Sequence, residues 1–187
     1  MPVPVPTEAP GDERGALLAY LEAQRGGIRR ALHGLTEEQA RSKPSASELS
    51  LAGVLKHVAV GERSAMRLMR GEPLDMRTQM REWEDSFVPG EDETVGRLLA
   101  LYDEVARETE ETVRALPSLD VTFTAPEFPW DKGGERSWRW GLLHQIEETA
   151  RHAGHADVIR ESIDGKGAFD LVFETGALPE PDWSSVR

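Results

Sequence analysis

The chain has 187 residues, of which 39% are hydrophobic and 30% charged, with a formal net charge of −12 and no cysteine. This length favours one domain with its own hydrophobic core, and the negative charge argues against binding to a nucleic-acid backbone. Without cysteine there is no disulfide, no thiolate nucleophile and no thiolate metal ligand. A bound metal would therefore need histidine and carboxylate ligands, and thiol chemistry would need a thiol supplied by a small molecule.

Neither the N-terminus nor the hydrophobic pattern indicates a membrane partner. Residues 1–11 are rich in proline and lack periodicity, so we expect a disordered arm. They also lack the basic and apolar regions of a signal peptide. No apolar run approaches the roughly 20 residues of a membrane-spanning helix. We therefore expect a cytoplasmic protein.

Hydrophobic periodicity predicts three long helices before the most informative segment of the chain. Their expected ranges are 12–33, 51–70 and 92–116. Asp12 can cap the first helix, the second begins after Ser50, and Pro117 closes the third. Thr36 opens a capping box that is typical of one short extra turn.

Two long connections and a tail complete the predicted organisation. Residues 71–90 and 117–136 contain aromatic side chains, so we expect ordered loops, with residues 121–124 in an extended conformation. Residues 166–187 are expected to form an irregular tail that packs back on the helices through residues such as Leu171 and Val172. Four long amphipathic helices without a strand system indicate an all-α four-helix bundle.

The fourth helix is predicted between Ser137 and Gly165. His144, Glu148 and His152 follow one another at intervals of four residues, so they share one helix face, and His155 follows three residues later. One interpretation is a solvated polar face. The other is a divalent-metal site, because Glu-x-x-x-His can offer two ligands to one ion and needs a third from elsewhere.

The second helix carries two further polar residues on or near its apolar stripe. His57 lies at the edge of the stripe, which is typical of a partly buried histidine. Glu62 lies at the centre of the stripe, where a carboxylate needs a partner or a pocket. The helical spacing directs Glu62 well away from His57.

Two stretches, SLAGVLKHVAVGE and SWRWGLLHQIEETARHAGHADVIRESIDG, resemble the DinB-like family of metal-binding bundles. The resemblance covers roughly residues 12–165 and is closest to a subfamily associated with thiol S-transferases. It implies a DinB-like four-helix bundle at 12–165, with long ordered loops, residues 1–11 as an arm and residues 166–187 as a tail.

The resemblance also implies a ligand set for one divalent ion. The family's second-helix histidine falls on His57, and its two fourth-helix ligands fall on Glu148 and His152. The glutamate departs from the common two-histidine form and is similar to that of mycothiol-dependent maleylpyruvate isomerases. We expect Zn²⁺, with Ni²⁺ as the alternative, and expect all three side chains to converge on it. His155 is a candidate catalytic acid or base, an alternative ligand or a support for the ligands, and His144 is assigned to structure.

Three functions follow from this resemblance. The first is a metal-dependent S-transferase or isomerase that activates a low-molecular-weight thiol, such as mycothiol or bacillithiol, for attack on a small-molecule electrophile. The second is a metal-dependent hydrolase in which the same ion activates water. The third is a non-enzymatic stress-response bundle that binds a metal or ligand. The position of Glu62 and the aromatic loops further suggest apolar surface that a homodimer would cover.

Overall fold

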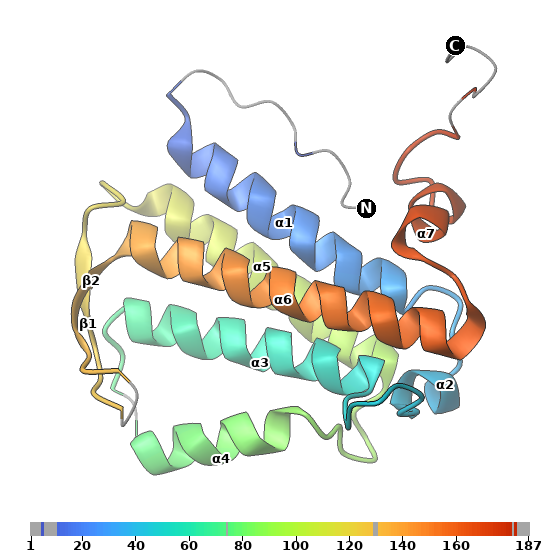
Figure 1. The fold of residues 1–187 in the computed structure, drawn as a ribbon. Helices are drawn as coiled ribbons and strands as arrows, with labels where there is room; N and C mark the ends of the chain where they lie inside the picture. The colour runs from blue at the N-terminus through green and yellow to red at the C-terminus, as the bar shows by residue number, and fades with distance from the viewer. Residues whose placement is uncertain (1–4, 6–10, 74, 129–130, 181, 183–187) are drawn as a thin grey trace.

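Four long helices pack side by side in the computed structural model, which describes residues 5, 11–73, 75–128, 131–180 and 182 (Figure 1). The long helices are α1 (Glu13–Ala31), α3 (Leu51–Met69), α5 (Val95–Ala115) and α6 (Trp138–Asp164). Helix α6 packs against α1 and α3, and α3 also packs against α5. The prediction of a four-helix bundle is confirmed. No helix in these described ranges is long and apolar enough to cross a membrane.

The ends of the long helices follow from their capping residues. The side chains of Asp12, Ser50 and Ser137 each accept a hydrogen bond from a backbone N–H in the first turn of the helix that follows. Gly165 ends α6 in the left-handed conformation, with φ of 81°. Helix α5 begins at Val95, later than predicted, because the side chain of Thr94 caps it.

Both connections contain more regular structure than predicted. The expected loop at residues 71–90 includes α4 (Met76–Ser86), which begins where Asp75 accepts hydrogen bonds from the N–H and hydroxyl of Thr78. The expected loop at 117–136 forms an antiparallel hairpin of β1 (Thr122–Ala125) and β2 (Gly134–Ser137). The residues expected to be extended, 121–124, largely coincide with β1, whereas the pairing with β2 was not predicted.

The remaining short elements are α2 (Glu37–Arg41) and α7 (Ala168–Glu174). Helix α2 begins at the predicted capping box, in which Thr36 and Gln39 exchange hydrogen bonds. Helix α7 replaces the first part of the predicted irregular tail and packs against α1, with Leu171 and Val172 buried. Most of the predicted arm at 1–11 and the end of the tail lie outside the described residues.

Two clusters of buried hydrophobic side chains form the core. One lies toward the α2 end of the bundle and includes Ile28, Leu55, Tyr102 and Ile159. The other lies beside the hairpin and joins Leu18, Met66, Met69, Val113, Leu119, Phe123, Trp138 and Leu142. Complete burial of one large apolar side chain contributes roughly 1.5–3 kcal/mol, so both ends of the bundle are well stabilised.

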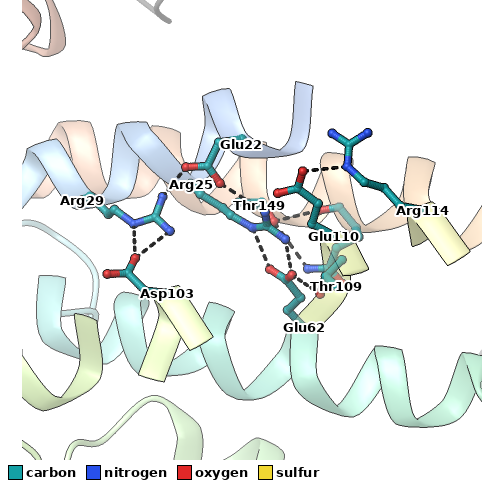
Figure 2. Close-up of polar contacts among 10 residues, drawn as sticks. Glu22, Arg25, Arg29, Glu62, Asp103, Thr109, Glu110, Arg114 and Thr149 are labelled. Carbon is teal, nitrogen blue, oxygen red and sulfur yellow. Dashed lines mark hydrogen bonds and ion pairs between the residues drawn. The ribbon is translucent and has the colours of Figure 1, made fainter. Parts of the chain in front are cut away.

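A buried ion pair lies between the two clusters (Figure 2). Arg25 Nε of α1 donates to Glu62 Oε2 of α3 at 3.1 Å, and Arg25 Nη2 donates to Glu62 Oε1. The hydroxyl of Thr109 in α5 donates to the same Oε1 at 2.6 Å. Arg25 and Thr109 therefore supply, within the chain, the partners that the position of Glu62 requires. This removes one of the reasons for expecting a homodimer.

Candidate functional site

His57 of α3 and His152 of α6 lie next to each other. Their ring centroids are 4.7 Å apart, with His57 half-buried and His152 buried. Glu148 lies one turn before His152, and its Oε2 is 3.9 Å from His152 Nε2. No group of three or more histidine, aspartate and glutamate side chains in the described part of the chain is arranged to hold an ion as it stands. Coordination by His57, Glu148 and His152 together would therefore require the side chains to rearrange.

A serine on α4 sets the tautomer of His57. Ser86 Oγ is 2.6 Å from the carbonyl oxygen of Trp83 and 2.8 Å from His57 Nδ1. The carbonyl can only accept, so the single hydroxyl proton of Ser86 goes to Trp83. Ser86 Oγ must then accept from His57, which places the imidazole proton on Nδ1. The lone pair of neutral His57 is thereby assigned to Nε2, as a metal-binding imidazole requires.

Both histidines are held in the neutral form that binds metals. Burial, followed by the nearby His152, lowers the pKa of His57 to about 4. Burial also lowers the pKa of His152, although the Glu148 carboxylate opposes that shift. His152 Nδ1 is buried and has no hydrogen-bond partner, which is costly for a polar nitrogen unless a ligand uses it. These observations fit the donor types that a divalent ion prefers.

Aromatic rings fix the orientation of His57. Phe87 stacks on it at a centroid distance of 3.9 Å and an interplanar angle of 15°. Trp83 meets the His57 ring edge-on at 6.5 Å and meets Phe87 in the same manner at 5.7 Å. Both aromatic residues come from α4 or the position just after it, so this short helix orients His57 by packing as well as by hydrogen bonding.

The other two histidines of α6 lie in different surroundings. His155 is exposed, with its ring centroid 5.4 Å from that of His152, so it lies at the outer edge of the histidine pair. His144 stacks on Trp140 at 5.2 Å, and its Nδ1 is 3.7 Å from Glu147. The sequence assigned His144 to structure, but it also lines the cavity that begins at His57.

This cavity has a volume of about 360 Å³ and lies between α3 and α4. Its described lining comprises His57, Val60, Gly61, Ser64, Gln79, Met80, Trp83, Ser86, Phe128 and His144. Four of these residues come from α4, in the segment predicted to be an ordered loop, and the sequence did not single them out as site residues. Met80, Trp83 and Phe87 recur at intervals of three and four residues, a signal that could have identified the helix.

A sequence model of the mycothiol S-transferase family matches residues 16–165. No curated protein matches the chain. Among solved structures, a conserved protein from Enterococcus faecalis is similar with a TM-score of 0.59 and 15% identity, over 80% of this chain and 96% of that chain. YfiT from Bacillus subtilis, described as a probable metal-dependent hydrolase with an unusual four-helix bundle topology, has a TM-score of 0.50 and 19% identity. That match covers 91% of this chain and 93% of YfiT. At these identities, the two structures support the fold.

Proposed function

The chain belongs to the mycothiol S-transferase family of DinB-like proteins, and from that premise we propose that it transfers a low-molecular-weight thiol to a small electrophile. His57, Glu148 and His152 would hold a divalent ion, for which we propose Zn²⁺. The observation that carries the proposal is the pair of neutral, adjacent histidines. The lone pair of His57 is assigned to Nε2, and His152 has an unpartnered buried nitrogen.

The ion, when bound, would lower the pKa of a coordinated thiol and so supply a thiolate near neutral pH. Each residue has a separate part in this proposal. His57 and His152 contribute neutral nitrogen ligands, and Glu148 contributes negative charge. His155, exposed beside His152, accepts the thiol proton. The thiol comes from solution because the chain has no cysteine.

Three variants separate these roles. His152→Ala should remove a ligand and abolish stoichiometric metal binding. Glu148→Gln keeps the side-chain size but loses the charge, so the ion should bind more weakly. His155→Ala should keep the metal and lose thiol-dependent turnover. Glu147→Gln is a matched control for Glu148→Gln, since Glu147 is the exposed neighbour of the proposed ligand and should leave metal content unchanged.

The measurements are metal content by elemental analysis and turnover with mycothiol or bacillithiol against a panel of electrophiles. Full metal content in both the His152 and Glu148 variants would refute the ligand set. Turnover that ignores added thiol would refute the transferase and favour hydrolysis by the same site. Metal binding without turnover of any kind would favour a binding protein.

A further inference from the structure

We propose that the cavity between α3 and α4 binds the electrophile, and that it selects an uncharged molecule with an aromatic body. This inference rests on the proposed transferase function, to which it adds a substrate class. Four observations carry it: the course of the cavity, the apolar residues of its wall, the lack of ionic groups in the described lining, and an unpacked glycine.

The cavity runs from His57 toward the hairpin end of the bundle. Its α3 wall consists of His57, Val60, Gly61 and Ser64. These positions have the i, i+3, i+4 and i+7 spacing of one helix face, which spans roughly 10 Å at 1.5 Å per residue. His57 lies at one end of this face and Ser64 at the other. An elongated ligand can therefore place its reactive carbon near His57 while the rest of the molecule extends away.

Two side chains of α4 make part of the cavity wall apolar and aromatic. Met80 and Trp83 remain 38% and 55% exposed although both are large apolar side chains, and both line the cavity. Trp83 is held edge-on to His57 and Phe87, so its ring is pre-oriented. A rigid aromatic surface of this kind favours an aromatic ligand through offset or edge-to-face contact.

The described lining contains no aspartate, glutamate, lysine or arginine, although 30% of the chain is charged. A carboxylate bound there would lose its hydration without a cationic side chain to replace it. Ser64, at the end remote from His57, and Gln79 instead offer uncharged hydroxyl and amide groups. These suit a neutral polar substituent such as a nitro, amide or carbonyl group.

Gly61 gives independent support for an open ligand space. It lies inside α3, where glycine lowers helix stability relative to alanine. A Cβ at this position would meet no atom within 4 Å, so close packing does not explain the glycine. The position of Gly61 in the cavity wall explains the glycine, because any larger side chain would occupy the space proposed for the ligand.

In the reaction, the thiol sulfur forms a bond to the electrophilic carbon, and the leaving group departs with the electron pair of the broken bond. The thiol proton passes to His155, as proposed above. The cavity takes no part in proton transfer. Its contribution is to hold the neutral aromatic body of the electrophile beside His57.

Binding of two unreactive probes tests the inference without thiol or metal chemistry. The matched pair is 3,5-dinitrobenzamide and 3,5-dinitrobenzoate, which have similar shape and differ in charge. Calorimetric titration of the full chain, with a chelator present and about 0.3 M salt to screen the overall negative charge, should show at least about tenfold tighter binding of the amide. Equal affinities, or tighter binding of the benzoate, would overturn the charge selection.

The substitution Gly61→Leu tests whether the amide binds in this cavity. It should weaken amide binding at least about tenfold without lowering the melting temperature, since leucine is a better helix former and has open space to enter. Gly154→Leu is the matched control, because Gly154 is also a helical glycine with no atom within 4 Å of its Cβ position, and it lies outside this cavity. Undiminished amide binding to a folded Gly61→Leu protein would overturn the assignment of the cavity.

Met80→Lys tests the charge selection directly. A lysine at the cavity wall should lower the ratio of amide affinity to benzoate affinity at least about tenfold. Val158→Lys, on the exposed surface of α6, should leave this ratio unchanged. An unchanged preference in Met80→Lys would overturn the proposal. These probes do not react, so amide binding without thiol-dependent turnover would refute the transferase function and leave the cavity's ligand class intact.

Discussion

Replacement of Ser86 by alanine tests how far α4 prepares His57 for metal binding. The variant loses the hydroxyl that accepts from His57 Nδ1–H at 2.8 Å and donates to the Trp83 carbonyl at 2.6 Å. Ser86 is only 1% exposed, so water cannot readily replace its oxygen. Loss of a hydrogen-bond partner of a metal-binding histidine typically lowers metal affinity by about 10–100-fold, or roughly 1.4–2.7 kcal/mol. We expect a loss in that range.

Two measurements check this expectation. Nitrogen-15 NMR of selectively labelled histidine should report the Nδ1–H tautomer for His57 in the metal-free protein and a mixture of tautomers in Ser86→Ala. Zn²⁺ affinity, measured by competition with a chelator, should fall by the stated factor. Ser162→Ala is the control, because the exposed Ser162 hydroxyl also donates to a backbone carbonyl of its own helix but lies away from His57. An Nε2–H tautomer in the unmodified protein, or unchanged affinity in Ser86→Ala, would refute the reasoning.

Three further predictions concern stability and assembly. Glu62→Ala should lower the free energy of unfolding by about 3–5 kcal/mol because it leaves Arg25 buried without its main partner. As a control, replacement of the exposed Glu104 by alanine should change the free energy of unfolding by less than about 0.5 kcal/mol. Urea denaturation measures both values. Gly53→Ala should destabilise the folded protein by about 1–3 kcal/mol because the added methyl group would collide with a backbone carbonyl. Gly61→Ala should stabilise the folded protein by about 0.5–1 kcal/mol. An equal effect at both sites would contradict this account. The homodimer stays a prediction, and light scattering that gives a monomer mass at high protein concentration would refute it.

The long helices could be predicted because their signals are local. Asp12, Ser50 and Ser137 cap the helices that they precede, Gly165 follows the end of α6, and Pro117 follows the end of α5. Such signals depend only on neighbouring residues and on hydrophobic periodicity. The contact between His57 and His152 could not be predicted in this way, because residue spacing alone identified only Glu148 and His152 as a possible pair of metal ligands. The family resemblance supplied the third position.

What the sequence missed depends on contacts between distant segments. Helix α4 packs against α3, and its apolar signal consists of a few residues among many charged ones, so hydrophobic periodicity predicts a loop there. Ser86 and Trp83 were missed with it, and with them the orientation of His57. The partner of Glu62 was equally hidden, because nothing in the spacing of α3 indicates that Arg25 of α1 faces it.

The geometry at His57 is set from two sides of α3. Glu62 follows His57 by five positions, which is about 140° around the helix at 100° per residue. When Glu62 faces Arg25 and Thr109, His57 therefore faces α4 and α6. Rotation of α3 that removed Glu62 from Arg25 would leave the buried Glu62 carboxylate without its cation and Arg25 with only its ion pair to Glu22, which is strongly unfavourable.

The end of α4 is fixed against the same helix. Gly53 permits the carbonyl of Phe87 to approach α3 where any side chain would collide with it. Lys56 Nζ, on the next turn, donates to the carbonyl oxygen of Val88 at 3.1 Å. These contacts bring Ser86 to His57 from one side while the buried ion pair orients α3 from the other. The orientation of His57 therefore depends in part on Gly53, Lys56 and Glu62, which lie outside the cavity lining. A substitution at Gly53 or Glu62 would act on the site through the orientation of α3 and α4.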